Sequence, residues 1–191
     1  MTEACPLIGY EWWTKFVPGS CGKPVHEVRI DSEDPHNIAG EIQARGRNLT
    51  IGYYKNPEAT EASYTDDGWF RTGDLGVMDK KNNIFIRGRI KSMILNSSGQ
   101  NIYPEEVEAV LTNCEYVDEC LVVDREGKIV ALVYTDLPKD MDEETRESIP
   151  GKIREEANKS LPAYSKITKV EMLDTPFKKT PKMSIKRFLY K

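Results

Sequence analysis

The hydrophobic pattern of this 191-residue chain changes near Gly88, and this change constrains the fold more than any other feature. Residues 17–88 contain short apolar runs of the β type separated by glycines, which favours an antiparallel sheet. Beyond them, apolar residues recur at helical spacing between further short strands. The sequence therefore predicts an α+β protein, with a β-rich, distorted barrel-like subdomain at 1–88 followed directly by a smaller α+β domain at 89–191.

Two elements of the first half have specific local signals. Asn56 can cap a helix, Pro57 fits its first position and Glu58 suits its positive end, so a helix is predicted at 56–64. The turn-forming residues 79–83 separate two apolar runs at the spacing of a hairpin. The predicted strands of this half are 28–30, 40–45, 75–78 and 84–87.

Helical and strand patterns alternate in the second half. One segment places three apolar side chains on one face behind an acidic first turn, and another, starting at Pro150, repeats apolar residues at every fourth position. Residues 124–127 have Asp first and Gly fourth, as a type I turn prefers, and predict a hairpin. The predicted elements are helices at 104–111 and 150–161 and strands at 120–123, 129–134 and 167–173.

Composition excludes several classes of protein. The longest apolar run is only a few residues, so a transmembrane helix is not expected. The opening residues, Met-Thr-Glu-Ala-Cys-Pro, lack the basic and apolar regions of a signal peptide, so we expect a cytoplasmic protein. Four cysteines without a CxxC spacing and two histidines give no credible zinc site, and reduced thiols are expected.

Charge is unevenly distributed along the chain. The net charge of −4 argues against nucleic acid as the main partner. Residues 152–191, however, have eleven Lys or Arg against four Asp or Glu, whereas the preceding part is acidic. Such a basic segment is expected to meet a polyanion, which could be a phosphorylated small ligand or an acidic neighbour.

The segment 69–75 is the first that suggests chemistry. Its Gly73 lets the backbone approach a ligand closely, and the carboxylate of Asp74 can accept two hydroxyl hydrogen bonds, as from a ribose. Taken alone, Thr-Gly-Asp is also compatible with an ordinary turn. Further glycine-containing blocks accompany it in order, at 40–46, 49–53, 88–91 and 99–108.

With these blocks, the chain resembles the adenylate-forming superfamily of acyl-CoA synthetases, peptide-synthetase adenylation domains and luciferases. The resemblance begins at residues 1–3, which are similar to the end of the family's Tyr-Gly-x-Thr-Glu motif. It continues through residues 18–24 to the C-terminal lysine-rich loop and so covers essentially the whole chain. Residues 6–8 and 161–167 look most like long-chain fatty acid–CoA ligases.

The resemblance implies a two-step ligase. In such enzymes ATP and a fatty acid give acyl-AMP and pyrophosphate, and coenzyme A then displaces AMP. A large N-terminal portion holds a glycine-rich phosphate loop and the acyl pocket, and a small C-terminal domain rotates between the steps. The sequence has no such phosphate loop, so we expect a C-terminal fragment that depends on a missing N-terminal portion and is inactive alone. Peripheral membrane contact of the parent enzyme stays open.

The resemblance also assigns roles to individual residues. Thr2 matches a threonine near the α-phosphate, and Glu3 matches the glutamate that holds Mg²⁺, a cation that prefers oxygen ligands. Asp74 matches the ribose-binding aspartate and Arg89 an arginine near the ribose and phosphates. Lys91 matches the hinge of the rotation. The alternatives are a disordered chain end for the first two, an ordinary turn for Asp74, and solvated side chains for Arg89 and Lys91.

One loop matches the channel for the pantetheine arm of coenzyme A, where small residues allow close backbone approach. An ordinary hairpin tip is the alternative for this loop. The matching residues are Ser97, Ser98, Gly99 and Gln100.

The C-terminal loop departs from the family pattern. The family's catalytic lysine, which stabilises negative charge during adenylation, falls on Ser184, and a serine cannot supply that charge. Either Lys182 or Lys186 substitutes through a shift of loop register, with Lys186 favoured, or the parent enzyme adenylates poorly. The alternative to a catalytic lysine is a basic tail that is only a solvated segment.

Other functions stay open at this point. They are another adenylate-forming ligase of the peptide-synthetase type, a non-catalytic module that binds a nucleotide or carrier, and a structural lid. Trp12, Trp13 and Phe16 are expected to be core or interface aromatics rather than a ligand cage. His26 and His36 have no pattern for nucleophilic catalysis.

Overall fold

A computed structural model describes residues 1–5, 8–96, 99–138 and 140–190. The chain divides into two compact units, Met1–Lys91 and Ser92–Lys191, which are described separately below. Within the described ranges, no helix combines the length and the apolar character that crossing a membrane requires.

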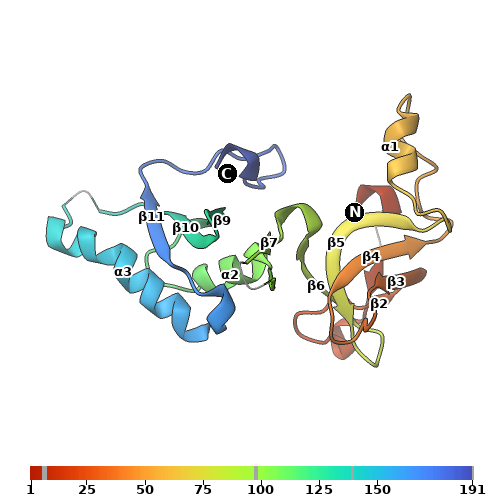
Figure 1. Ribbon diagram of the computed structural model, residues 1–191, viewed down its shortest axis with the longest axis horizontal. Helices are drawn as coiled ribbons and strands as arrows, with labels where there is room; N and C mark the ends of the chain where they lie inside the picture. The colour runs from red at the N-terminus through yellow and green to blue at the C-terminus, as the bar shows by residue number, and fades with distance from the viewer. Residues whose placement is uncertain (6–7, 97–98, 139, 191) are drawn as a thin grey trace. The chain divides into compact units, whose positions relative to one another are not determined.

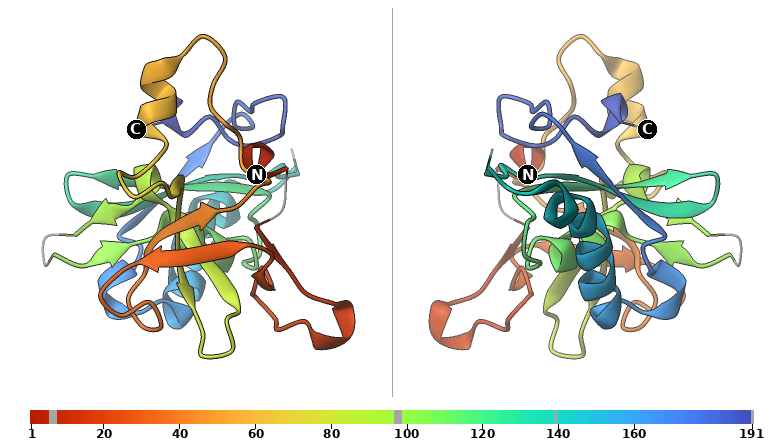
Figure 2. Two further views of the ribbon diagram at one scale, coloured as in Figure 1. Left: turned by 90° about the vertical axis from the view of Figure 1, so that its right-hand side faces the viewer. Right: turned by 90° about the vertical axis from the view of Figure 1, so that its left-hand side faces the viewer.

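The first unit is built on a four-stranded antiparallel sheet in the order β3-β4-β5-β6 (Figure 1; Figure 2, left). The predicted hairpin of β5 and β6 is confirmed, and β3 pairs antiparallel with β4 within the predicted antiparallel sheet. Ile30, Ile42 and Ile84 form the buried centre of one sheet face. The strands are β1 (Gly9–Tyr10), β2 (Lys23–Pro24), β3 (Glu27–Asp31), β4 (Gly40–Arg45), β5 (Phe70–Met78) and β6 (Ile84–Arg89).

Three short helices accompany this sheet: η1 (Thr2–Ala4), η2 (Trp13–Lys15) and α1 (Pro57–Ala62). The predicted cap of α1 is confirmed, because the side chain of Asn56 accepts a hydrogen bond from the Ala59 N–H at 3.0 Å.

The aromatic residues around η2 are not part of the core. Trp12, Trp13 and Phe16 are 63%, 85% and 53% exposed, because the connection between β1 and β2 extends away from the sheet (Figure 2). The core alternative is therefore wrong, and the interface alternative stays a prediction.

The second unit has a three-stranded sheet in the order β11-β10-β9, in which β10 pairs antiparallel with β9 and parallel with β11. The connection between the parallel strands is α3, as parallel pairing requires a long crossover. Helices and strands share the unit, which confirms the predicted α+β class. The elements are η3 (Ile90–Ser92, across the boundary), β7 (Ile94–Leu95), β8 (Asn101–Ile102), α2 (Pro104–Leu111), β9 (Glu119–Arg125), β10 (Lys128–Tyr134), α3 (Glu143–Ser160), η4 (Ala163–Ser165), β11 (Lys169–Leu173) and η5 (Arg187–Leu189).

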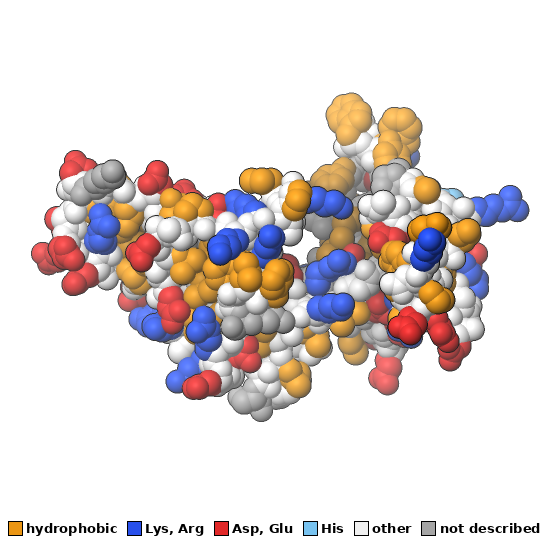
Figure 3. Space-filling view, turned by 90° about the horizontal axis from the view of Figure 1, so that it is seen from above, with side chains coloured by type: hydrophobic (Ala, Val, Ile, Leu, Met, Phe, Trp, Pro, Cys, Tyr) orange, Lys and Arg blue, Asp and Glu red, His pale blue; other side chains and the backbone are white. Residues whose placement is uncertain are grey.

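Both faces of this sheet are covered, because alternate strand residues point to opposite sides. On one face, Val122 packs with the buried residues of α2 and α3 (Figure 2, right). On the other, Leu121 and Val123 pack with Phe177 of the segment that follows β11. The last residues of the chain are therefore part of the fold, and basic side chains gather over them (Figure 3).

Two local predictions for this unit are wrong in detail. The helix predicted from Pro150 begins at Glu143, capped by Asp142, whose side chain accepts from the Thr145 N–H at 2.7 Å. This cap and the burial of the helix face outweigh the hydrogen bond that a proline inside the helix removes. The predicted type I turn is instead a two-residue turn at 126–127, in which both residues have positive φ, 55° and 77°. Such a type I′ turn matches the twist of the strands it joins.

Candidate functional site

A bulge in β5 places the predicted ribose-binding residue. Glu41 pairs with Leu75 and Gln43 with Arg71, so one residue of β4 faces three residues of β5. The three are Thr72, Gly73 and Asp74. Gly73 has a φ of +71°, a conformation that suits glycine. Because bulges re-aim side chains, this register is what directs the Thr-Gly-Asp segment out of the ladder.

The polar groups of the bulge find partners nearby. The Thr72 hydroxyl donates to the Ile42 carbonyl at 2.6 Å and accepts from the Asp74 N–H at 3.1 Å. The Gly73 N–H donates to the Glu41 carboxylate at 3.2 Å. These bonds replace the ladder bonds that the bulge interrupts, so the loop has a defined shape.

The structure brings Asp74 and Arg89 together. They stand opposite each other in the β5–β6 hairpin, and Arg89 Nη1 donates to Asp74 Oδ1 at 2.6 Å. The same nitrogen donates to the Thr72 carbonyl at 3.2 Å. The Asp74 side chain is 26% exposed and the Arg89 side chain is 59% exposed. A carboxylate and a guanidinium therefore reach solvent at the same place.

Two hollows flank this pair. One, of about 550 Å³, is lined by Glu41, Tyr53, Gly73 and Arg89 and also by Lys91, the predicted hinge. Lys91 is exposed and lies in η3 at the last residue of the first unit. Asp74 lines a second hollow of about 220 Å³, whose walls are mostly apolar and include Met1, Ile8, Ile84 and Ile86.

Thr2 and Glu3 lie in η1, so the described chain end is helical here. Tyr53 donates to Glu3 Oε1 at 3.4 Å, and Tyr53 also lines the larger hollow. The Glu3 carbonyl accepts from the Thr50 N–H at 2.8 Å. Among the described residues, no group of three metal-ligating side chains occurs, and Glu3 is a single carboxylate.

The C-terminal basic loop is closed by backbone hydrogen bonds. The Thr180 N–H donates to the Ser184 carbonyl at 2.8 Å, and the Lys186 N–H donates to the Lys178 carbonyl at 2.9 Å. Lys182 and Ser184 are exposed at the turn, whereas Lys186 is half-buried at its base. The loop thus presents Lys182 to solvent more openly than Lys186, which was the favoured substitute for the missing lysine.

An ion cluster that the sequence analysis missed holds the end of this loop. Arg187 Nη2 lies 2.5 Å from the Glu108 carboxylate and 3.5 Å from that of Glu105, both on α2. Glu108 also accepts from the Val122 N–H at 2.7 Å. Burial raises the pKa of Glu108 to about 7, although Arg187 opposes the shift. The signal available in the sequence was Glu108 itself, a charged residue on the same face of the predicted helix as the apolar Leu111.

The predicted coenzyme A loop is described only in part. Ser97 and Ser98 lie outside the described residues. Gly99 and Gln100 are exposed in the turn between β7 and β8, where their N–H groups donate to the Asn96 carbonyl and side chain at 3.0 and 2.8 Å. Gly99 has a φ of +75°. This geometry fits a hairpin turn, and its role in a channel stays a prediction.

Comparisons with known proteins place these features in context. Residues 91–190 match the profile of the AMP-binding enzyme C-terminal domain. The chain is 36% identical over 148 residues to indoleacetate–CoA ligase of Aromatoleum aromaticum, a match that covers 71% of this chain and 29% of the relative. It is 41% identical over 105 residues to 2-succinylbenzoate–CoA ligase of Listeria monocytogenes, covering 55% of this chain and 21% of that one.

Solved structures give the same picture. o-Succinylbenzoate CoA synthetase from Bacillus subtilis, in complex with its acyl-adenylate intermediate, superposes with a TM-score of 0.83 and 28% identity. The superposition covers 100% of this chain and 40% of that one. The same synthetase with ATP and magnesium ion gives a TM-score of 0.76 over 98% of this chain. The chain therefore spans well under half the length of the proteins it matches.

Proposed function

The chain belongs to the AMP-binding enzyme C-terminal domain family through residues 91–190, and from this premise we propose that it forms the C-terminal part of an AMP-forming ligase that joins a carboxylic acid to coenzyme A. The observation that carries the proposal is the pairing of Asp74 with Arg89 at the bulge of β5, directly before the matched domain. The relatives named above are CoA ligases, which favours this function over a peptide-synthetase domain, a binding module or a structural lid.

Asp74 is proposed to bind the ribose of ATP and of the acyl-adenylate. One of its oxygens already accepts from Arg89, and the carboxylate has further lone pairs for hydroxyl groups. Arg89 supplies a fixed positive charge beside them for the phosphates. The apolar hollow on the other side of Asp74 offers a surface for a flat base.

Mg²⁺ fits the residues present. This ion is commonly held by one or two carboxylates together with substrate phosphates, rather than by a cage of protein ligands. Glu3 supplies one half-buried carboxylate, connected through Tyr53 to the hollow that Arg89 lines. Thr2, its neighbour in η1, is proposed to contact the α-phosphate. When bound, the ion would neutralise phosphate charge.

The second unit is proposed to supply different groups in the two steps. Rotation at Lys91 would bring the basic loop to the nucleotide for adenylation, where Lys182 or Lys186 provides the cation that Ser184 lacks. In the second step the turn containing Gly99 and Gln100 would line the path of coenzyme A. The exposure of Lys91 and of the loop tip supports both movements.

A long-chain fatty acid is the narrower proposal for the acid substrate of the ligase, and the relatives do not support it. They are named for indoleacetate, 2-succinylbenzoate, oxalate and 4-coumarate, which are aromatic or small acids. We therefore propose an organic carboxylic acid as the substrate and keep both classes in the test.

The test uses the purified protein that contains this chain, with ATP, Mg²⁺, coenzyme A and a panel of 2-succinylbenzoate, indoleacetate, 4-coumarate, oxalate and palmitate. We expect AMP, pyrophosphate and an acyl-CoA with at least one acid. Asp74→Ala should raise the KM for ATP at least about tenfold, whereas Asp66→Ala, at an exposed aspartate, should not. Release of ADP, or nucleotide binding without turnover of any acid, would contradict the proposal.

A further inference from the structure

Glu41 is the partner of the bulge that carries Asp74. Its side chain is only 10% exposed, and its two oxygens accept from different neighbours. Oε1 accepts from the Gly73 N–H at 3.2 Å, and Oε2 accepts from Arg71 Nη1 at 3.1 Å. One largely buried carboxylate thus contacts both the Gly73 N–H, next to Asp74, and the side chain of Arg71, the last paired residue before the bulge.

The interruption of the β4–β5 ladder explains why this contact matters. Three residues of β5 bulge out opposite Ile42, so the Gly73 N–H has no ladder carbonyl to bond. An N–H left without a partner costs free energy, and the Glu41 carboxylate supplies a charge-assisted bond in its place. That bond holds the peptide between Thr72 and Gly73, one residue before Asp74.

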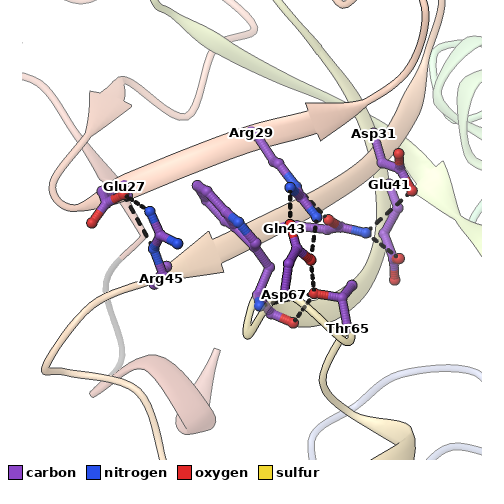
Figure 4. Close-up of polar contacts among 9 residues, drawn as sticks. Glu27, Arg29, Asp31, Glu41, Gln43, Arg45, Thr65 and Asp67 are labelled. Carbon is purple, nitrogen blue, oxygen red and sulfur yellow. Dashed lines mark hydrogen bonds and ion pairs between the residues drawn. The ribbon is translucent and has the colours of Figure 1, made fainter.

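A second layer holds Glu41 itself. Gln43 is fully buried, and its amide nitrogen donates to Glu41 Oε2 and to Asp31 Oδ2, both at 3.2 Å (Figure 4). The Gln43 oxygen accepts from Arg29 Nε at 2.7 Å. Arg29 in turn makes a two-bond contact with Asp67 at 2.6 and 3.0 Å. Glu41 therefore stands at the end of a hydrogen-bonded row that crosses the sheet.

We propose that Glu41 is a positioning residue of the nucleotide site, which acts only through the Gly73–Asp74 bulge, and that Gln43 fixes its orientation. The inference rests on the proposed function, because it assigns Asp74 to the ribose. Glu41 also lines the hollow that Arg89 lines, so the double variant below is what separates an effect that passes through Asp74 from a direct contact with the nucleotide. The free-energy effects on ATP binding of removing the Glu41 and the Asp74 side chains should therefore not add in the double variant.

The kinetic test compares Glu41→Ala, Asp74→Ala and the double variant in the protein that contains this chain. We expect Glu41→Ala to raise the KM for ATP about tenfold, with kcat changed less than about threefold, and the double variant to equal Asp74→Ala alone. Glu41→Gln keeps an oxygen for the Gly73 N–H and should have a smaller effect. Glu27→Ala, at the exposed far end of the same sheet face, is the matched control and should leave the KM unchanged.

Multiplying effects in the double variant, or a lowered Tm with an unchanged KM for ATP, would overturn the proposal. A separate measurement on this chain does not depend on catalysis: the amide proton of Gly73 should shift upfield and exchange faster in Glu41→Ala than in wild type or Glu27→Ala. An unchanged Gly73 amide would overturn the proposal even if the ligase assay succeeds. If Asp74→Ala leaves ATP kinetics unchanged, the proposed function fails at this site, while the Gly73 amide still reports on the bulge.

Discussion

Replacing Glu108 by glutamine should remove a pH dependence from the stability of the second unit. Burial raises the pKa of Glu108 from 4.5 to about 7. Charged groups from other positions face it: Arg187 lowers its pKa, and Glu105 on the same helix raises it. The half-buried thiol of Cys120, whose pKa rises to about 11, stays neutral at these pH values. The removal of the carboxylate from water outweighs its ion pair with Arg187.

The sign and size of this pH dependence of the free energy of unfolding follow from proton linkage. Because the pKa is higher in the folded unit than in the unfolded chain, folding favours the protonated carboxyl. The stabilisation is complete below the ordinary value of 4.5 and is lost as the pH rises through about 7. One pKa unit corresponds to about 1.4 kcal/mol, so the free energy of unfolding should fall by about 2.5 kcal/mol between about pH 5 and about pH 8. The carboxyl groups with lowered pKa, such as Asp79 and Asp142, titrate below this window.

Urea unfolding followed by two probes can measure this fall in one sample. All three tryptophans lie in the first unit, at 12, 13 and 69, whereas the long helices α2 and α3 lie in the second. Circular dichroism at about 222 nm therefore reports mainly the second unit, and tryptophan fluorescence reports the first. Glu108→Gln should give a circular-dichroism midpoint that is flat between about pH 5 and about pH 8, with the variant about 2 kcal/mol more stable than wild type at the upper end.

Glu147→Gln, at an exposed glutamate of α3, is the matched control and should keep the wild-type slope. The reasoning is refuted if the slope persists in Glu108→Gln, or if the wild-type protein shows no fall across the window. A slope seen equally by fluorescence would also refute it, because the first unit does not contain Glu108.

Two further predictions concern the first unit. Gly76→Ala should destabilise it by about 2 kcal/mol, because a Cβ would lie 2.6 Å from the Phe85 carbonyl oxygen. Gly68→Ala is the control, because a Cβ there meets nothing within 4 Å although φ is +81°, and it should cost only about 1 kcal/mol. If the two variants lowered the midpoint of unfolding seen by fluorescence equally, the packing argument would be contradicted. Hydrogen bonds, chiefly from Arg29, lower the pKa of Asp67 to about 2, so its stabilisation is present at neutral pH and lost as the pH falls from about 4 through about 2. Asp67→Asn should flatten the acid limb of the stability curve, and an unchanged limb would contradict this role.

Local signals predicted the elements whose determinants are close in sequence. The cap of α1 depends on Asn56 and the N–H three residues later, and both are visible in the sequence. The β5–β6 hairpin depends on two apolar runs and the turn residues between them. The start of α3 was missed because Pro150 also fits the first turn of a helix, while the buried Ile149 just before it shows that the helix is already under way.

Contacts between distant residues could not be predicted in the same way. The buried Glu108 carboxylate is compensated by the Val122 N–H and by Arg187, which lies 79 positions later and reaches it through the fold of the last segment. The same limit applies to Gln43, since a polar residue in a strand is ordinarily expected on the solvated face. Its complete burial depends on Arg29 and Asp31 from the neighbouring strand and on Glu41 from its own.

The Thr-Gly-Asp segment shows why the site needed both kinds of information. The tripeptide alone suits many turns, and nothing in it sets the direction of the aspartate. The register between β4 and β5 makes it a bulge, the positive φ of Gly73 allows the bulge, and Glu41 replaces the bond that the bulge loses. A short motif can therefore be recognised from its residues, whereas the orientation on which its chemistry depends comes from a carboxylate 32 positions earlier. If this is correct, Glu41→Ala should damage ATP use while every residue of the motif stays in place.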